Sequence, residues 1–168
     1  MYHRFGESKY PSTNIQLDVF KKQLQIIERE GIRFIHPSQI EESISTKKNE
    51  RKILLTIDDG LLSFYENAWP LLKLKKIPFI LFVNTREVGS FNYMNWQQIK
   101  ELYAEDFVEI GNHSHSHEYL VDEQSSFIKE DILNSIKIFK EKLGKNSIFF
   151  SYPFGEYSLQ FKKIIKDL

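Results

Sequence analysis

Three short clusters in this sequence carry side chains that can bind a metal ion or transfer a proton. The first is Asp58-Asp59, which directly follows the apolar run 53–57 and precedes Gly60. One carboxylate of such a pair can bind a cation while the other stays available as a base. In isolation, Asp-Asp-Gly is more often a solvated turn. Because this pair follows a run typical of a buried strand, we expect both carboxylates at the edge of a sheet.

The second cluster is rich in histidine, since His113, His115 and His117 all fall within residues 113–117. Across a turn from a loop into a helix, the imidazoles of His113 and His117 can converge on one ion. His115 is expected to point elsewhere, in a supporting or structural role. The alternative is a polar loop or an accidental metal-binding tag. Two histidines and one aspartate form a ligand set with open positions, which suits zinc or another first-row divalent ion.

The third cluster is Tyr-Pro-Phe-Gly at residues 152–155, which follows an apolar run at 148–150. Proline and glycine mark many kinds of turn, so this segment is weak evidence by itself. After a strand, however, it could direct a backbone N–H into a site formed by the other two clusters.

Segments with helical and strand-like patterns alternate along the chain and must position these clusters. Helices are predicted at 17–30, 38–44, 69–74, 96–103, 126–143 and 158–168, and strands at 31–35, 53–57, 78–83, 108–111 and 148–150, with a polar loop at 45–52. Gly31 and Gly144 are expected to end the helices that precede them. Repeated strand–helix units indicate an α/β fold with a parallel sheet. Each cluster follows a predicted strand, and ligands bind at the carboxyl ends of strands in such sheets.

The composition excludes several classes of protein. The chain has 168 residues, 41% of them hydrophobic and 27% charged, which is typical of one folded globular domain. Lys plus Arg and Asp plus Glu both total 23, so no net positive charge favours nucleic acid. The absence of cysteine excludes disulfides, thiolate catalysis and sulfur ligands for a metal. No stretch reaches the roughly 20 apolar residues of a membrane span.

The cellular location stays open at this point. The segment 1–10 is polar and aromatic and lacks the apolar core of an export signal. Either the protein stays in the cytoplasm, or an export segment is missing from this chain and the protein works in the cell envelope or outside the cell.

Taken together, the clusters resemble the motifs of the polysaccharide deacetylases, also called the NodB-homology or carbohydrate esterase 4 family. Residues 56–60 (Thr-Ile-Asp-Asp-Gly) are similar to the family's Thr-Phe-Asp-Asp-Gly motif, and residues 113–117 to its His-Ser/Thr-x-x-His motif. Residues 151–155 match its Arg-x-Pro-Tyr-Gly motif at the proline and glycine. Order and spacing agree over most of the chain. The resemblance implies a distorted, incomplete (β/α) barrel of the NodB-homology type.

The resemblance also implies a reaction and a role for individual residues. The reaction is the hydrolysis of N-acetyl groups on an N-acetylglucosamine-type polysaccharide or oligosaccharide. Asp59, His113 and His117 would hold a divalent metal, zinc in the first place, with cobalt, nickel or iron as alternatives. Asp58 would be the general base that deprotonates the attacking water. The backbone amide of Phe154 would help to stabilise the oxyanion.

A general acid must protonate the departing amine. In most of the family a histidine in a late Leu-x-His motif does this, and no such motif follows Gly155. The start of the chain, Met-Tyr-His-Arg-Phe at 1–5, resembles the N-terminal Tyr-His motif of a permuted branch that deacetylates biofilm poly-N-acetylglucosamine. In that branch the acid precedes the Asp pair, which implies His3 as the acid. The alternative is that His3 is a frayed terminal residue.

The chain also departs from the family pattern. Ser151 stands where the family has an arginine that steadies the catalytic aspartate. Family barrels contain more strand–helix units than this chain shows, so we expect residues 1–168 to be one catalytic domain truncated at its C-terminus. Trp69 and Trp96 could stack on sugar, but aromatic residues at helical spacing are more often part of the core.

Two other functions remain open at the level of sequence. The same metal site could serve a deformylase or amidase that acts on a lipid-linked sugar or a small cyclic amide, because the motifs do not cover the loops that select the substrate. The chain could also be a non-catalytic glycan-binding module with a vestigial site. The retained Asp58 argues against a module of that kind, because a binding protein needs no base.

Overall fold

The structure, a computed structural model, describes residues 1–46 and 50–168. The helices are α1 (Leu17–Arg29), α2 (Ile40–Ser45), α3 (Trp69–Lys75), α4 (Trp96–Tyr103), α5 (Ser125–Leu143) and α6 (Leu159–Asp167). The strands are β1 (Arg4–Phe5), β2 (Asn14–Ile15), β3 (Arg33–Phe34), β4 (Lys52–Ile53), β5 (Leu55–Ile57), β6 (Phe79–Val83) and β7 (Val108–Asn112). The predicted alternation of strands and helices is confirmed. Within the predicted polar loop, residues 47–49 lie outside the described part of the chain.

The central sheet brings the ends of parallel strands to one edge. β5, β6 and β7 pair in that order, with Val83 opposite Asn112. β6 is buried along its whole length, as its continuous apolar run predicts. Single parallel bridges extend the sheet on both sides, from Tyr2 to Ile57 and from Asn112 to Phe150. The N-terminal segment and the segment before Pro153 therefore lie at the edges of the same sheet.

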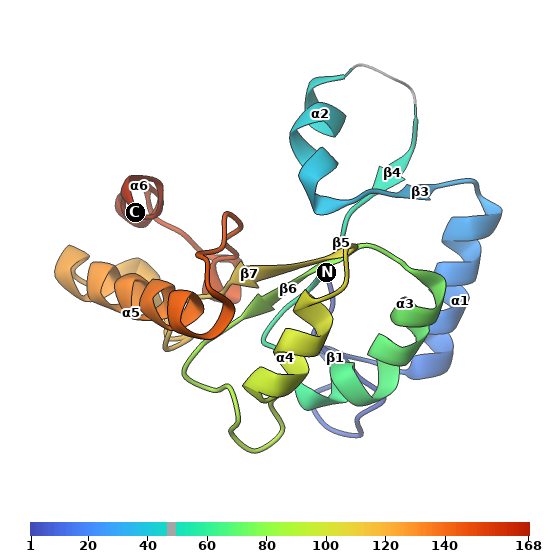
Figure 1. The fold of residues 1–168 in the computed structure, drawn as a ribbon, viewed down its shortest axis with the longest axis horizontal. Helices are drawn as coiled ribbons and strands as arrows, with labels where there is room; N and C mark the ends of the chain where they lie inside the picture. Colours follow the sequence, from blue (N-terminus) through green and yellow to red (C-terminus); the bar gives the residue numbers. More distant parts are fainter. Residues whose placement is uncertain (47–49) are drawn as a thin grey trace.

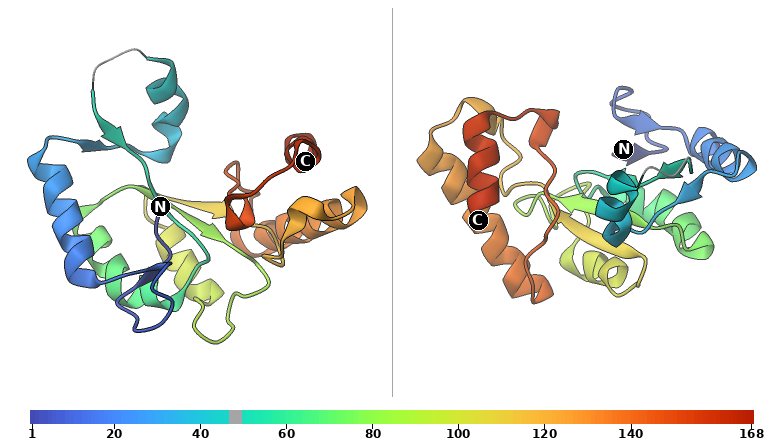
Figure 2. Two further views of the ribbon diagram at one scale, coloured as in Figure 1. Left: turned by 180° about the vertical axis from the view of Figure 1, so that it is seen from behind. Right: turned by 90° about the horizontal axis from the view of Figure 1, so that it is seen from above.

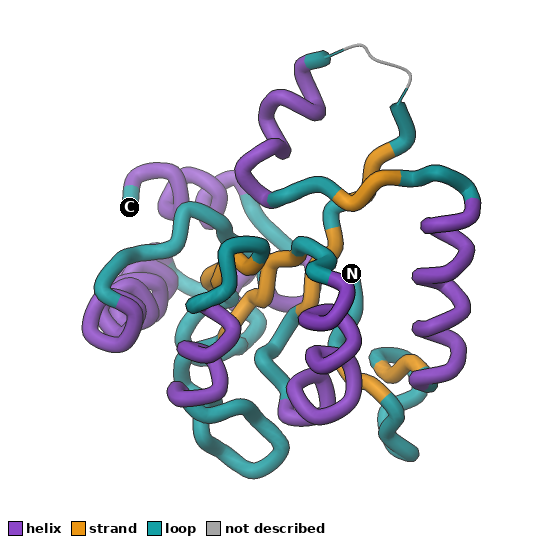
Figure 3. Tube along the Cα trace, turned by 45° about the vertical axis from the view of Figure 1, so that its right-hand side comes forward, coloured by secondary structure: helices purple, strands orange, loops and turns teal. Residues whose placement is uncertain are grey.

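The expected barrel is not confirmed. Besides the central sheet, the described residues form two separate parallel pairs, β1–β2 and β3–β4, and no closed barrel is seen among them. Figure 1 shows α2 with β3 and β4 projecting from the main body, and Figure 2 shows α5 and α6 side by side at the end of the molecule away from α1. In Figure 3 the central sheet lies in the middle, with helices around it. The fold is a mixed α/β fold.

Aromatic side chains make up much of the core. The rings of Phe5 and Phe20 lie 4.9 Å apart, which packs β1 against α1. Trp69 is 3% exposed and its ring contacts that of Phe79 on β6. Trp96 packs edge-on against Phe139 of α5. Both tryptophans are therefore structural, as aromatic residues at helical spacing usually are.

The helix ends follow the predicted glycines. Gly144 ends α5 in a left-handed conformation (φ 78°), and Gly31 follows α1 in the same conformation (φ 63°). The predicted helix at 38–44 begins instead with a turn of 3₁₀ helix, Pro37–Gln39, which His36 caps by accepting a hydrogen bond from the N–H of Ser38. Among the described residues, none of the helices combines the length and the apolar character that a bilayer crossing demands.

Two strand predictions were wrong in extent. The predicted strand 148–150 makes only one bridge, because the segment pairs with a single residue of β7: Asn112 donates to Phe149 and accepts from Ser151. The predicted strand 53–57 is divided into β4 and β5, and only β5 joins the central sheet.

Candidate functional site

The Asp pair lies where β5 ends. The N–H of Asp58 donates a 2.8 Å hydrogen bond to the carbonyl of Tyr2, which ties the N-terminal segment to this strand end. The chain then turns through left-handed conformations at Asp59 (φ 75°) and Gly60 (φ 69°). Aspartate and glycine tolerate this region better than bulky or β-branched residues do. The predicted position of both carboxylates at a sheet edge is confirmed.

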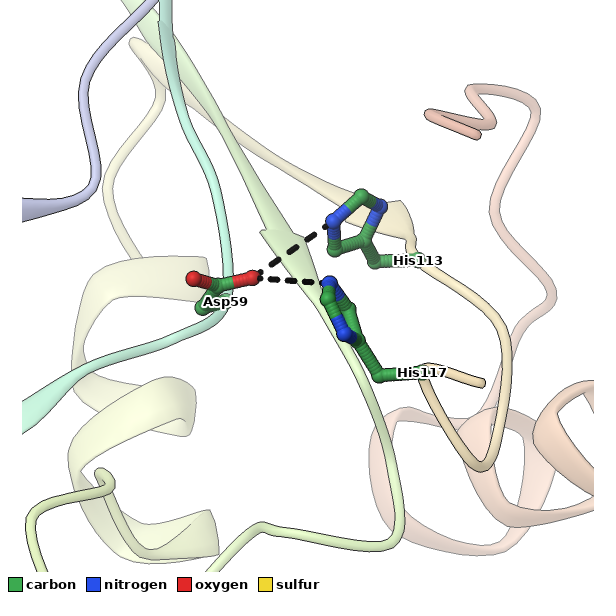
Figure 4. Close-up of side chains that lie close together, drawn as sticks. All are labelled: Asp59, His113 and His117. Carbon is green, nitrogen blue, oxygen red and sulfur yellow. Dashed lines mark ion pairs between the residues drawn. The ribbon is translucent and has the colours of Figure 1, made fainter. Parts of the chain in front are cut away.

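Asp59 faces two histidines that follow β7 (Figure 4). Its Oδ1 atom lies 3.2 Å from Nε2 of His117 and 3.5 Å from Nε2 of His113. One ligand atom from each of the three residues lies within 4.8 Å of the others. The Oδ1 atom is buried and has no hydrogen bond of acceptable geometry among the described residues. A buried carboxylate oxygen that faces two imidazole nitrogens fits a first-row divalent metal ion such as zinc.

The surroundings of the two carboxylates shift their pKa values in opposite directions. Burial alone would raise the pKa of Asp59, but the imidazoles of His113 and His117 hold it well below its usual range. Burial raises the pKa of Asp58, the charge of Asp59 raises it further, and the electrostatic influence of His113 and His3 offsets only part of this. Asp59 is therefore the carboxylate that stays charged, as a metal ligand must, while Asp58 accepts a proton more readily.

The orientation of His113 is set by a backbone carbonyl. Its Nδ1 atom lies 2.8 Å from the carbonyl oxygen of Ser151, which can only accept a hydrogen bond. Nδ1 therefore carries a proton. In the neutral imidazole that can bind a metal ion, the lone pair is then on Nε2, the nitrogen that faces Asp59. Metal-binding histidines commonly have such a partner on their other nitrogen. This contact could not be predicted from the sequence, because every residue has a backbone carbonyl and the residue type does not indicate which one will contact the histidine.

The loop of residues 113–119, which we call the histidine loop, is held against α5 by hydrogen bonds to a buried carboxylate. Asp131, 5% exposed, accepts a 2.8 Å hydrogen bond from the N–H of His115 on Oδ1 and a 3.0 Å bond from the N–H of Ser116 on Oδ2. Sequence reasoning missed Asp131 too. The available signal was an aspartate among the apolar residues of an amphipathic helix, which is rare unless the carboxylate has buried partners.

A second chain of hydrogen bonds holds the same loop. Asn112 donates to Ser135 of α5 and accepts from the N–H of Ser114, whose hydroxyl accepts from the N–H of His117. Ser114 and His117 both have left-handed backbones, with φ 67° and 56°. The predicted turn from a loop into a helix was therefore wrong, because these side-chain bonds hold His117 in an irregular loop. His115 has the expected supporting position, with Nδ1 2.9 Å from the hydroxyl of Thr85.

One pocket of about 680 Å³ contains every residue that the sequence analysis assigned to the site. It is lined by His3, Asp58, Asp59, His113, His117 and Phe154, together with Met1, Thr13, Thr56, Phe82, Phe150, Ser151, Tyr152 and Gly155. His3 reaches the pocket because Tyr2 is paired with Ile57 at the end of β5. At Phe154 the backbone is left-handed (φ 61°), a conformation that is costly for a bulky residue and is often found at functional sites.

Comparisons with known proteins agree with this geometry. The sequence profile of a family described as polysaccharide deacetylase matches residues 45–168. The poly-beta-1,6-N-acetyl-D-glucosamine N-deacetylase of Staphylococcus aureus is 27% identical to this chain, in an alignment that covers 90% of this chain and 57% of that protein. The chain thus spans just over half the length of this relative.

Two solved structures share the fold over nearly the whole chain. IcaB from Ammonifex degensii has a TM-score of 0.90 at 29% identity, over 99% of this chain and 77% of that one. The deacetylase PplD of Streptococcus pyogenes, solved in complex with acetate, has a TM-score of 0.86 at 24% identity with the same coverage. Because the profile match covers most of the sequence and the folds agree, the chain belongs to the polysaccharide deacetylase family.

Proposed function

We propose that this chain is a metal-dependent deacetylase that removes N-acetyl groups from an N-acetylglucosamine-type glycan. The observation that carries the proposal is the convergence of Asp59, His113 and His117 beside a second buried carboxylate, that of Asp58. The Oδ1 atom of Asp58 is also without a hydrogen-bond partner in the described part of the chain. A buried, unpaired carboxylate is costly for stability, and a binding protein would gain nothing from it.

In the proposed mechanism, a divalent ion held by Asp59, His113 and His117 would polarise the acetyl carbonyl and lower the pKa of the attacking water. Asp58 takes a proton from this water while the oxygen of the water bonds to the acetyl carbon. The raised pKa of Asp58 favours this role, because a base whose pKa lies closer to the working pH accepts the proton more readily. The backbone amide of Phe154 donates a hydrogen bond to the oxyanion that develops.

The collapse of the oxyanion breaks the carbon–nitrogen bond, and the departing amine needs a proton. His3 supplies this proton in the proposed mechanism, so that acetate and a free amino sugar result. Two observations support His3 over the alternative of a frayed terminus. It lines the pocket beside Asp58, and the neighbouring Tyr2 is fixed both by its backbone bridge to Ile57 and by its ring, which packs on Phe20.

We further propose that residues 1–168 form one catalytic domain whose sheets belong to a distorted, open (β/α) barrel. The single bridges at Tyr2 and Phe150 support this, since they extend the central parallel sheet on both sides. The proposed substrate class rests on the family and on relatives named as poly-beta-1,6-N-acetyl-D-glucosamine deacetylases.

Product analysis tests the proposed reaction against its alternatives. Zinc-loaded or cobalt-loaded protein would be incubated in parallel with N-acetylglucosamine oligomers, their N-formyl analogues and a small cyclic amide. We expect acetate from the acetylated oligomers, with an equal amount of new free amine. Release of formate alone, or opening of the cyclic amide alone, would assign a different hydrolase. Binding of oligomers without any product would identify a non-catalytic glycan-binding module.

A further inference from the structure

An exposed pair of aromatic rings continues outward from the rim of the pocket. The ring of Phe154 lies 4.9 Å from the ring of His117 on one side and 6.0 Å from that of Tyr119 on the other. Phe154 lines the pocket and is 61% exposed, and Tyr119 is 45% exposed. We call these two side chains the aromatic ledge. Their rings are inclined by 52°, so the ledge is an open angle rather than a flat plane.

The ledge is held in place without being buried. The hydroxyl of Tyr119 donates a 2.6 Å hydrogen bond to Oε2 of Glu156, which joins the end of the histidine loop to the turn that contains Phe154. Phe154 itself is presented by a left-handed backbone (φ 61°). Exposed apolar rings and a strained backbone both lower stability, so their combination at the rim of a pocket points to a binding role.

We propose that the aromatic ledge is a carbohydrate subsite, which binds the sugar unit next to the one whose acetyl group lies at Asp59, His113 and His117. This inference rests on the proposed function. A pyranose ring carries C–H groups on its faces and hydroxyls around its edge, so a face can pack on an aromatic ring while the edge stays hydrated. Glu156 adds a carboxylate that can accept hydrogen bonds from these hydroxyls.

Other features of the molecule favour a sugar over other occupants. Trp69 and Trp96 are taken up by the core, so they are not available to stack on a glycan. Glu156 and Asp122 place negative charge beside Tyr119, which disfavours contact of the ledge with an anionic lipid surface. The ledge is also continuous with the pocket through Phe154, so an oligosaccharide bound at the metal site would extend over it.

Binding measurements on the metal-free protein test the ledge independently of catalysis. Isothermal titration calorimetry would give the affinities for N-acetylglucosamine and its trimer, with wild type, Tyr119→Ala, Tyr119→Phe and Phe91→Ala. We expect Tyr119→Ala to weaken trimer binding about three- to tenfold, as the loss of one stacking ring does. Tyr119→Phe should lose less, because it keeps the ring. Phe91 is 90% exposed and does not line the pocket, so Phe91→Ala should bind the trimer like wild type.

The same variants, loaded with cobalt and incubated with the acetylated trimer, separate this inference from the proposed deacetylase activity. The ledge proposal is overturned if Tyr119→Ala binds the trimer like wild type, if Phe91→Ala loses as much affinity, or if wild type does not bind the trimer. It is also overturned if Tyr119 is needed for binding to phosphatidylglycerol vesicles but not to the trimer. Tyr119-dependent binding without acetate release by the cobalt-loaded wild type would support the ledge and contradict the deacetylase. Acetate release, together with trimer binding that does not depend on Tyr119, would support the deacetylase and contradict the ledge.

Discussion

Asp58 and Asp59 are neighbours in sequence, but their side chains meet different surroundings. Asp59 turns through a left-handed backbone toward His113 and His117, whose imidazoles keep its pKa low. Asp58 is buried beside it, and this burial raises its pKa. Environments that shift the pKa values of two carboxyl groups in opposite directions suit one group to bind a metal ion and the other to act as a base. The sequence predicted this division from the family motif, and the side-chain geometry is consistent with it.

Asp58→Asn should abolish most of the turnover while metal affinity is kept, because the substitution removes the base and leaves the three ligands. A base contributes roughly 10²- to 10⁴-fold to a rate, so kcat should fall by about that factor. The measurement is kcat for acetate release together with the metal content of the same sample. An equal loss of metal and activity would show that the roles of Asp58 and Asp59 are reversed.

His3→Ala should lower kcat about 10²-fold with metal content unchanged, because His3 is proposed as the acid and is not a ligand. An aryl acetate, whose leaving group departs without protonation, should be hydrolysed by this variant nearly as fast as by wild type. An unchanged rate on the acetylated oligomer would remove His3 from the mechanism.

At the scale of elements, α5 positions the loop that carries both candidate histidine ligands. The carboxylate of Asp131 accepts the N–H groups of His115 and Ser116, and Ser135 one turn later accepts from Asn112. The loop has no regular secondary structure between β7 and Leu120, so these bonds replace the ladder of a strand or helix. A helix distant from the candidate metal ligands in sequence thereby fixes their geometry.

Asp131→Ala should weaken zinc affinity about 10- to 100-fold, the usual effect of losing a group that orients metal ligands. A competitive chelator titration measures this, with circular dichroism to show that the fold is kept. Glu130→Ala, an exposed change on the same helix, is the matched control and should bind zinc like wild type. Equal affinities for Asp131→Ala and wild type would contradict the positioning role of α5.

β7 approaches the pocket wall so closely that only glycine fits at residue 111. A Cβ atom on Gly111 would lie 2.2 Å from the ring of Phe82, which lines the pocket. Gly111→Ala should therefore lower the free energy of unfolding by about 1–3 kcal/mol, as overpacking does. Urea denaturation measures this loss. In a Phe82→Leu background the loss should shrink, because the ring is gone, and an equal loss in both backgrounds would contradict the clash.

How far the sequence predicts the elements depends on their length. Long periodic segments such as α4 and α5 were predicted within a residue or so, because their apolar spacing and the glycine after α5 are local signals. β1 and β2, each of two residues, are too short to show a period and were not predicted. The segment 148–150 has the composition of a strand but pairs only at Phe150, which depends on where β7 ends.

The same limit applies to the site. His3, the Asp pair and the two histidines were predicted as site residues because motifs preserve residue type and spacing, and Phe154 was predicted from its position in the third motif. Asp131 and the Ser151 carbonyl were missed because their roles arise from folding: one is a side chain on a distant helix, and the other is a backbone atom. Phe154 was identified for its backbone amide, whereas the exposure of its ring beside Tyr119 is visible only in the structure.

At the scale of the whole molecule, the pocket unites segments that are far apart in the chain. The N-terminus reaches it through the bridge from Tyr2 to Ile57, and the turn at Phe154 through the bridge from Asn112 to Phe150. Both bridges join the same central sheet, so the sheet is the frame that brings the proposed acid, base and metal ligands together.

The most direct test of this account is a cobalt titration of metal-free protein in which bound metal and acetate release from N-acetylglucosamine oligomers are measured on the same samples. Wild type should gain activity in proportion to bound cobalt and saturate at one ion per chain. Asp59→Ala should neither bind cobalt at that concentration nor release acetate. Acetate release by metal-free wild type, or by Asp59→Ala at the wild-type rate, would contradict the assignment of Asp59, His113 and His117 as the catalytic metal site.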